Sequence, residues 1–274
     1  MRAENEKGLP MTLHDRRAAI LSALARSGDV GIAELASSLS VSEMTIRRDL
    51  ELLENKGRLR RVRGGAISTV SRSYEPTFAL RQGHARDEKA AIGRAAAALL
   101  ADGETAILDV GTTTLEIARS LHGRRHITVV TPSIAIAAEL GNEPEMRILV
   151  TGGVLRSGEL SLVGAAAEST FKRLNCDVVF LGVAGVDAEK GLTEYNLDDA
   201  SVKQAALVAA RRCIVVADSS KLGRVALANI APLTGIDVLV TDALPDHPSV
   251  AAIVAAGVEL VHVSGHQVAV EVAS

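Results

Sequence analysis

Two short amphipathic segments joined by a tight turn constrain the fold of this chain more than any other feature. Residues 32–39 carry apolar side chains at i, i+3, i+4 and i+7, and residues 46–53 carry them at i, i+4 and i+7. This spacing is that of a helix with one buried face. Ser42 can cap the second helix, because its hydroxyl can accept a hydrogen bond from a first-turn N–H group. Since only a short connection precedes Ser42, the segment predicts a helix-turn-helix.

The flanking residues extend this motif to a winged helix-turn-helix. Residues 15–25 carry enough leucine and isoleucine for a supporting first helix. Gly57 is placed to end the third helix. Residues 58–63 then predict a short strand, Gly64-Gly65 a turn, and Ala66-Ile67 the start of a second strand.

The charge of the chain is divided unevenly along its length. Residues 1–72 hold 13 Lys and Arg against 9 Asp and Glu, a net charge of +4, whereas residues 73–274 hold 17 against 24, a net charge of −7. Residues 56–63 contain five basic residues and no acidic one. Such a charge run alone usually marks a solvated surface, and two adjacent amphipathic helices alone form an αα-hairpin. Their combination with a basic Gly-Gly hairpin favours binding of double-stranded DNA by the first part of the chain. The five aromatic residues and the absence of Trp argue against stacking on single strands.

Residues 12–68 resemble the DNA-binding domain of the DeoR family of bacterial transcriptional regulators. The resemblance rests on Val41-Ser42, Thr45-Ile46-Arg47-Arg48-Asp49-Leu50, Leu53 and Arg61-Val62-Arg63-Gly64-Gly65-Ala66, in the family's order and spacing. Two positions depart from the family pattern. Gly31 replaces a Ser or Thr cap at the start of the second helix, and Arg63 replaces a histidine before the Gly-Gly pair.

The candidate DNA-binding residues follow from groove chemistry. They are Ser42, Met44, Thr45, Arg47, Arg48, Arg58, Arg60, Arg61 and Arg63. Arg47 and Arg48 are candidates for guanine edges or for phosphates. Met44 and Thr45 can touch thymine methyl groups, while Ser42 and Thr45 can equally bond phosphate oxygens. The four later arginines are expected to hold the DNA backbone. Asp49 either orients an arginine or merely solvates the helix.

The second part of the chain alternates short apolar runs with alanine-rich helical segments. The expected strands are Thr105–Val110, Ile127–Val130, Arg147–Val150, Val178–Leu181, Cys213–Ala217, Val238–Val240 and Val258–Val263. The expected helices are Glu88–Leu100, Thr113–Leu121, Ser133–Leu140, Ser161–Leu174, Asp199–Ala210 and Ser249–Ala256. Apolar strands separated by helices predict a Rossmann-like α/β domain, whose mostly parallel sheet is covered on both faces. We expect a DNA-binding domain at residues 12–68, a linker at 69–75 and a sensing and oligomerisation domain at 76–264.

Small polar residues and glycines collect where the expected strands end. Because ligands of open α/β sheets bind outside the carboxyl ends of the strands, and helix N-termini bind anions, these residues predict a phosphate-binding site. The candidates for effector binding are Asp109, Gly111, Thr112, Thr113, Thr114, Thr131, Ser133, Gly152, Gly153, Asp187 and Lys221. Any one of them has an ordinary alternative as a turn or helix cap, and Glu194 and Lys203 have an alternative as surface charges.

Residues 75–262 resemble the DeoR-type sensor domain. The matching stretches are Pro76-Thr77-Phe78 with Arg81, Glu88-Lys89 with Ile92-Gly93, Gly111-Thr112-Thr113-Thr114, Thr131-Pro132-Ser133, Thr151-Gly152-Gly153, Gly191-Leu192-Thr193, Asp218-Ser219-Ser220-Lys221 and Thr241-Asp242. Pro132 departs from a common asparagine. The resemblance implies a fold similar to ribose-5-phosphate isomerase and a phosphorylated sugar as effector.

These features together predict a ligand-controlled repressor of a carbohydrate-utilisation operon, with activation left open. Paired half-sites on the DNA operator imply at least a dimer, either a dimer or a tetramer. The rival hypothesis is a sugar-phosphate isomerase that recruits Asp109, Asp187, Glu194, Lys203 and Lys221 for proton transfer. A third hypothesis is an architectural DNA binder without effector. We expect no cofactor, no metal site and no catalytic residue. We also expect a cytoplasmic protein, because Cys176 and Cys213 stand alone, as thiols in a reducing compartment do. No membrane contact is expected, because the sequence has no long apolar run.

Overall fold

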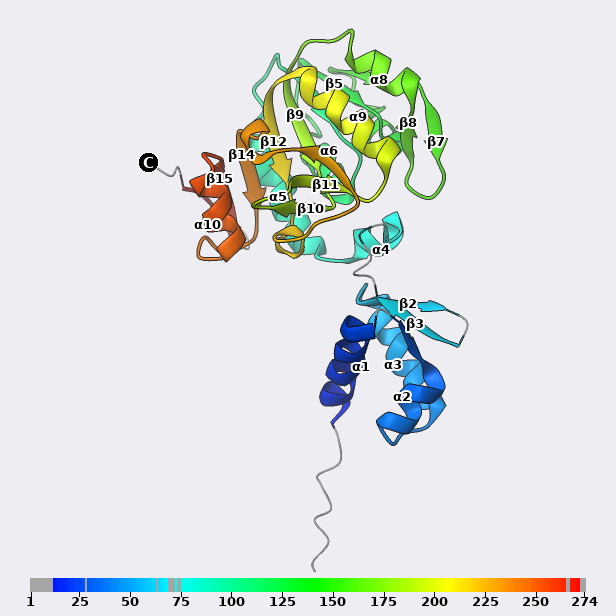
Figure 1. Ribbon diagram of the computed structural model, residues 1–274. Helices are drawn as coiled ribbons and strands as arrows, with labels where there is room; N and C mark the ends of the chain where they lie inside the picture. The colour runs from blue at the N-terminus through cyan, green and yellow to red at the C-terminus, as the bar shows by residue number, and fades with distance from the viewer. Residues whose placement is uncertain are drawn as a thin grey trace, which may run out of the picture. The chain divides into compact units, whose positions relative to one another are not determined.

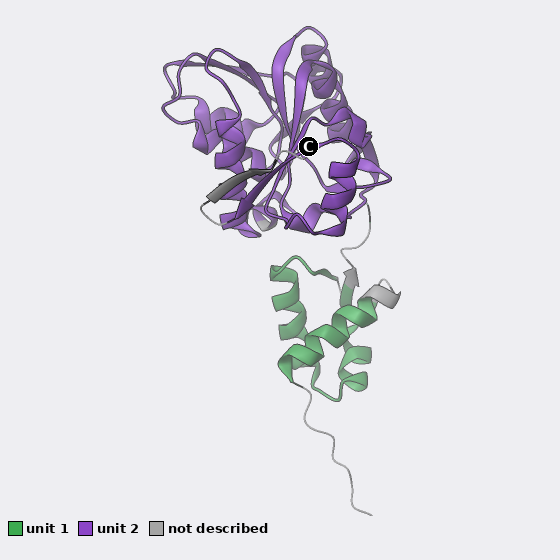
Figure 2. Cartoon of the chain, turned by 90° about the vertical axis from the view of Figure 1, so that its left-hand side faces the viewer, with its two compact units in different colours: residues 1–76 green, residues 77–274 purple. Residues whose placement is uncertain are grey.

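The chain forms two compact units, residues 1–76 and residues 77–274 (Figure 2). The computed structural model describes residues 12–27, 29–62, 64–68, 72, 75–264 and 267–271. Within these residues, no helix is both long and apolar enough to cross a membrane.

The first unit is a winged helix-turn-helix. Its elements are α1 (Leu13–Ser27), β1 (Asp29–Gly31), α2 (Ile32–Ser38), α3 (Glu43–Asn55), β2 (Leu59–Val62) and β3 (Gly65–Ser68) (Figure 1). Strands β2 and β3 form the predicted antiparallel hairpin, and β1 adds to the free edge of β3. Strand β1 is too short to be recognised in the sequence.

The predicted caps and apolar stripe of this unit are confirmed. The Ser42 hydroxyl accepts a hydrogen bond from the Thr45 N–H at 3.2 Å. Ile46, Leu50 and Leu53 are buried, in one cluster with residues of α1, α2 and the strands. Helix α3 ends as expected before Gly57, whose φ of +66° places it in the left-handed region that glycine adopts without strain.

The second unit is an α/β domain built on a sheet of eight described strands, in the order β16-β15-β14-β12-β9-β4-β5-β6. All neighbours pair in parallel except β15 and β16, which are antiparallel. The strands are β4 (Thr105–Leu108), β5 (Ile127–Thr131), β6 (Met146–Val150), β9 (Cys176–Gly182), β12 (Ala210–Val216), β14 (Val238–Thr241), β15 (Glu259–Ser264) and β16 (Gln267–Glu271). The seven strands predicted from apolar runs are all present.

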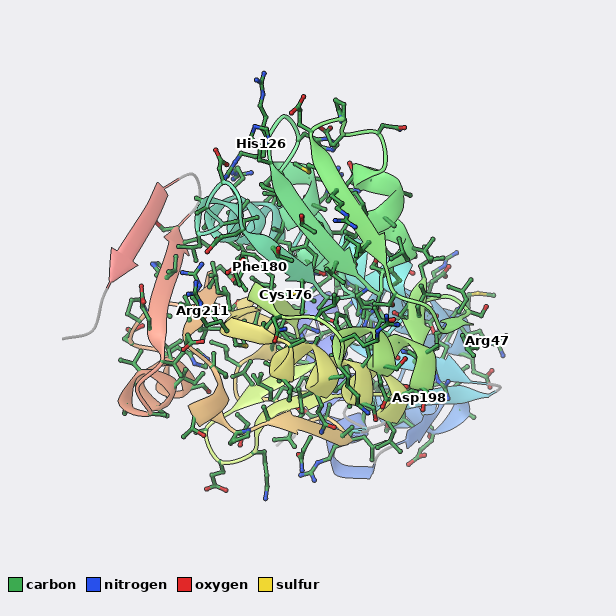
Figure 3. The ribbon with its side chains drawn as sticks, turned by 90° about the horizontal axis from the view of Figure 1, so that it is seen from above. Arg47, His126, Cys176, Phe180, Asp198 and Arg211 are labelled. Atoms are coloured by element: carbon green, nitrogen blue, oxygen red, sulfur yellow. The ribbon has the colours of Figure 1, made fainter. Side chains whose placement is uncertain are left out.

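Helices cover both faces of this sheet, as the apolar strands predicted. In β9, Val178 and Phe180 pack in the cluster that contains α5 (Arg86–Ala98), α6 (Thr112–Ser120) and α7 (Ile134–Leu140). The alternate residues Val179 and Leu181 pack in the cluster that contains α8 (Ala165–Phe171), α9 (Leu197–Val208) and α10 (Pro248–Ala255). Successive side chains of a strand point to opposite faces, so both faces must be apolar. In Figure 3, Phe180 lies inside these layers, whereas the exposed His126 lies at the periphery.

The strand order creates a topological switch point between β4 and β9. The chain runs outward from β4 through β5 to β6, and then returns to the other side of β4 to form β9, β12, β14 and β15. The crossovers on the two sides of this point leave in opposite directions. The carboxyl ends of the strands at such a switch point, here β4 and β9, are the usual ligand position in open α/β folds.

The predicted helix over residues 161–174 is wrong at its start. Residues Ser161–Val163 form β8, which pairs with β7 (Val154–Arg156), and α8 begins only at Ala165. A three-residue strand is too short for its alternation to be told from a helical stripe. Other short elements were not predicted from the sequence: α4 (Phe78–Gly83), two 3₁₀ turns (Ser219–Lys221 and Leu233–Gly235), and a small antiparallel sheet of β10 (Gly185–Asp187), β11 (Gly191–Glu194) and β13 (Ala228–Ala231).

Candidate DNA interface and effector site

Helix α3 presents the predicted groove-reading side chains to solvent. Met44, Arg47 and Arg48 are exposed, opposite the buried stripe of the helix. Thr45 is half-buried, and its hydroxyl lies 2.9 Å from that of Ser42, so the two hydroxyls share one hydrogen bond. Arg47 forms an exposed i,i+4 pair with a glutamate of the same helix at 3.2 Å, which is a weak contact that a DNA partner can replace.

The arginines of the wing are exposed but not equivalent. Arg58, Arg60 and Arg61 are all solvent-exposed. Arg61 is held by Glu54 at the end of α3, because its backbone N–H donates to one carboxylate oxygen at 2.8 Å and its Nε to the other at 2.7 Å. This contact fixes the wing to the end of α3. Arg63 lies outside the described residues.

Asp49 orients arginines, one of the two alternatives that the sequence left open. It is buried in α3, and it binds Arg16 at 2.5 Å and Arg17 at 2.9 Å. Both partners come from α1 and not from α3, so Asp49 joins the two helices.

A buried ion-pair network occupies the switch point of the second unit. The Nζ of Lys203, in α9, donates to Asp109 Oδ2 after β4 and to the Gly182 carbonyl at the end of β9, the latter at 2.9 Å. It also lies 3.4 Å from Glu194 Oε2 in β11. The Gly182 N–H donates to Asp109 at 3.1 Å. Lys203 and Glu194 are therefore core residues, and the interpretation of them as surface charges is wrong.

The charges of this network shift the pKa values of its members. Burial raises the pKa of the Asp109 carboxyl to about 6, against the opposing effect of the Lys203 ammonium. Burial favours a lower pKa for Lys203, but the carboxylates of Asp109 and Glu194 outweigh it and raise that pKa. Both shifts leave Asp109 ionised and Lys203 charged at neutral pH, so the network is a true ion pair that joins β4, β9 and α9.

The loop after β4 leads into helix α6 at the carboxyl end of the strand. Gly111 is the N-cap with φ of +153°, a conformation that a side chain would strain, and among the described residues no side chain caps this helix. Thr112, Thr113 and Thr114 follow in the first turn and are buried. The Thr114 hydroxyl donates to the Gly111 carbonyl at 3.0 Å.

The residues that follow β5 and β6 lie next to one another, because the two strands are parallel neighbours and their carboxyl ends are adjacent. Thr131 and Ser133 are satisfied internally, since Thr131 donates to the Leu108 carbonyl at 2.6 Å and Ser133 caps α7. Gly152 and Gly153 follow β6 and lie exposed.

Two buried hydroxyls beside them have no hydrogen-bond partner among the described residues, Thr151 Oγ1 and Ser161 Oγ. A β-bridge joins Ser161 to Ser133, and the Thr151 N–H donates to the Thr131 carbonyl at 3.1 Å. Buried polar atoms normally find a partner, so these two hydroxyls are candidates to bind a polar ligand or water.

A group of basic side chains lies around the carboxyl end of β12. Its members are Lys221, Arg224, Arg81 and Lys89. Burial lowers the pKa of the Lys221 ammonium to about 8, with Asp218 opposing and the positive charges of Arg224, Arg81 and Lys89 adding to the effect. Lys89 Nζ lies 4.0 Å from Asp218 Oδ2, and this buried oxygen has no hydrogen-bond partner among the described residues.

An open cleft of about 820 Å³ adjoins this group, lined by residues 83–88 with Asp218, Ser219, Ser220, Asp242 and His247. Asp187 does not reach it through its carboxylate, which accepts the N–H groups of Glu189 and Lys190 and so closes the β10–β11 turn.

Comparison with known proteins assigns both units. The DeoR-like helix-turn-helix domain matches residues 16–72, and the DeoR C-terminal sensor domain matches residues 84–243. The chain belongs to the DeoR family. It is 38% identical over 247 residues to the HTH-type transcriptional regulator GlpR of Haloferax volcanii, covering 90% of this chain and 96% of that protein. It is 35% identical over 229 residues to the transcriptional repressor AccR of Agrobacterium fabrum, covering 83% and 89%.

This DeoR-family protein is a DNA-binding transcriptional regulator, as its sequence predicted. Among solved structures it is similar to ribose-5-phosphate isomerase A of Methanocaldococcus jannaschii, with a TM-score of 0.38 and 17% identity, covering 50% of this chain and 54% of that one.

Several residues at the edge of the DeoR sensor domain escaped the sequence analysis, namely Arg81, Lys89, Thr151, Ser161 and Asp218 as potential ligand contacts. One signal was available for Lys203: it lies four residues after Asp199 on the apolar face of α9, where a lysine needs a buried partner. No local pattern distinguishes Ser161, because its burial depends on the pairing of β7 with β8.

Proposed function

We propose that this regulator represses a carbohydrate-utilisation operon and leaves its DNA operator when a phosphorylated sugar binds the second unit. Residues 12–68 would bind the operator, with the candidate side chains of α3 and the wing in the roles given above, and residues 76–264 would sense the effector and associate with a second copy. The name of the relative AccR, a transcriptional repressor, supports the sign of the response. Paired half-sites support a dimer or larger assembly.

The observation that carries the effector proposal is the set of buried polar atoms without partners at one edge of the sheet. Thr151 Oγ1, Ser161 Oγ and Asp218 Oδ2 lie at this edge without a hydrogen-bond partner among the described residues. Hydroxyls of the sugar would satisfy Thr151 and Ser161, since a hydroxyl can both donate and accept. Asp218 follows β12, four strands away from β6. The uncapped N–H groups of α6 and the ammonium group of Lys221 suit a phosphate. Asp109 would not contact the sugar; through its hydrogen bonds with Gly182 and Lys203 it would hold β4, β9 and α9 in place.

The same site is connected to the start of the sensing unit. Lys89 Nζ donates to the backbone carbonyls of Arg81 at 2.5 Å and His84 at 2.8 Å, and so holds the end of α4. Arg81 itself forms an ion pair with Glu159 in the β7–β8 turn. Helix α4 is the first element after the DNA-binding unit. A phosphate that attracts Lys89 would weaken its hold on α4, which gives the effector a route to the chain that carries the DNA-binding unit.

We propose that the effector is bound and not converted. The rival enzyme hypothesis recruits Asp109, Asp187, Glu194, Lys203 and Lys221 to move protons. The Asp187 carboxylate closes the β10–β11 turn instead. Asp109, Glu194 and Lys203 are buried, and Lys203 contacts both carboxylates. Proton transfer by these groups would have to break the buried contacts of Lys203 with the two carboxylates, and breaking such a contact is costly.

The experiment combines binding and release. A duplex selected by the full-length protein from a random pool is titrated in the presence of sugar phosphates, the matching free sugars and inorganic phosphate. The proposal expects one sugar phosphate to weaken DNA binding, and Lys221→Met to abolish that response while Lys190→Met, an exposed turn variant, retains it. If no phosphorylated metabolite changes the affinity, the sensing proposal is wrong. Turnover of any sugar phosphate by the same preparation would overturn the claim of binding without conversion.

A further inference from the structure

The contact between α1 and α3 joins two positively charged side chains to a single negatively charged one. Two guanidinium groups, those of Arg16 and Arg17, share the single carboxylate of Asp49. Arg16 Nε binds one carboxylate oxygen at 2.5 Å and Arg17 Nε binds the other at 2.9 Å. Asp49 is only 2% exposed, whereas the side chains of Arg16 and Arg17 are 12% and 21% exposed. One carboxylate thus neutralises one of the two cations.

The donors of both arginines are only partly used. A guanidinium has five N–H donors in a planar fork, and among the described residues each of these arginines makes one hydrogen bond, through Nε. The terminal NH₂ groups remain available. Asp15 Oδ2 accepts a hydrogen bond from the Thr12 hydroxyl at 2.6 Å, and among the described residues the ion pairs of Arg16 and Arg17 are those with Asp49.

The position of the two arginines within α1 also calls for an anion. Arg16 and Arg17 lie in the first five residues of a helix that spans Leu13–Ser27. The helix dipole is positive at this end, so cations in the first turn are unfavourable unless an anion compensates them. Asp15 lies in the same first turn and Asp49 forms the two ion pairs, but these pairs use only the Nε atoms, so a phosphate group could bind the terminal NH₂ groups.

We propose that Arg16 and Arg17 form a phosphodiester-binding site at the start of α1, and that Asp49 positions them there. Asp49 follows Arg47 and Arg48 directly in α3, so the carboxylate that holds the site belongs to the helix that carries the groove-reading arginines. The contact to the DNA backbone from α1 would fix the depth and angle at which α3 enters the groove. The site extends the DNA interface beyond α3 and the wing, and it does not depend on the effector proposal.

The test measures how DNA affinity depends on salt, because each phosphate contact contributes about 0.9 to the slope of log K against log salt concentration. Full-length protein without any sugar phosphate is titrated into a fluorescent duplex of random sequence and into a duplex selected from a random pool. Arg17→Gln is expected to reduce the slope by about 0.9 on both duplexes, and Arg17→Lys to retain most of it. Arg211→Gln is the matched control, since it removes one exposed positive charge from the second unit.

Asp49→Asn separates positioning from simple charge. This variant makes the first unit more positive by one charge. If DNA were attracted only by the total charge of the unit, the variant should bind DNA more tightly. The proposal instead predicts weaker binding and a smaller slope, with Asp49→Glu restoring part of both. Thermal melting identifies any variant whose first unit is unfolded. If Asp49→Asn is such a variant, the difference in salt slope between Arg17→Gln and Arg17→Lys tests the proposal instead. An unchanged slope in Arg17→Gln, or an equal reduction in Arg211→Gln, overturns the proposal.

Discussion

Replacing Lys203 by methionine tests whether the switch point depends on its buried ion pair. The ammonium group bonds Asp109 and the Gly182 carbonyl, and it lies 3.4 Å from Glu194. The side chain of Lys203 is 2% exposed and that of Asp109 is 1% exposed. Methionine is unbranched and one heavy atom shorter, so it keeps most of the apolar stem and removes the charged group with its donors. The variant leaves two carboxylates buried without their cation.

The expected loss of stability is large for a single substitution. Removing one partner of a buried pair costs about 3–5 kcal/mol, because the remaining charge is uncompensated. For a unit of this size, 1 kcal/mol shifts the melting temperature by about 2–4 °C, so the transition of the second unit should fall by roughly 6–20 °C. Calorimetry of the full chain at neutral pH measures it. Lys190→Met, at an exposed turn position, should stay within about 0.5 kcal/mol of the parent.

The pH dependence of Lys203→Met identifies the cause of the loss. Burial already raises the pKa of Asp109 to about 6 with the lysine present, and removing the opposing cation raises it further. A carboxyl group whose folded-state pKa is raised gives more stability as pH falls, since the folded state then takes up the proton. The deficit of the variant should therefore shrink between pH 7 and pH 5, and a second change, Asp109→Asn, should recover part of it at pH 7. A deficit that is the same at both pH values would refute the unpaired-charge argument and indicate lost packing.

Three further predictions concern the DNA-binding unit and one surface cluster. Arg48→Ala should weaken binding to a selected duplex by about 1–3 kcal/mol if the side chain reads a base; an equal loss on random DNA would assign it to the backbone. Ser42→Ala should lower the free energy of unfolding of the first unit by about 1 kcal/mol, with Ser42→Gly close to the parent in denaturant titrations. Hydrogen bonds to Glu139 and Glu143 raise the pKa of His122, so its contribution to stability is complete below the ordinary histidine pKa and is lost as pH rises through the raised value. His122→Gln should remove this pH dependence, and an unshifted imidazole titration by NMR would contradict it.

The sequence predicted the elements whose signals are local. The Ser42 cap, the apolar stripe of α3 and the glycine after it lie within a few residues of one another, and each appears in the structure as expected. The seven apolar runs of the second unit became seven parallel strands, because a strand buried on both faces has to be apolar throughout. Errors concentrated in short elements: β7 and β8 have three residues each, too few for a periodic signal.

The candidate site was predicted only in outline. The polar residues after β4, β5 and β6 do lie at one edge, since parallel strands place all their carboxyl ends together. Asp187 was expected at such an end, but it lies in a separate antiparallel hairpin, where its carboxylate closes the turn. Which hydroxyls are satisfied and which are left without partners depends on neighbours distant in the sequence, as with Ser161 and Ser133.

The sequence by itself determined the two folds and the DNA-binding character of the first unit, because caps, periodicity and clustered charge act over one or two helical turns. Only the tertiary structure decided the partners of the buried charges. Asp49 turns toward α1, 33 residues away from Arg16, and Lys203 reaches Asp109 across 94 residues. A buried charge takes its partner from whatever lies nearest in space, since desolvation makes an unpaired ion too costly, and spatial proximity is fixed by the order in which strands and helices pack.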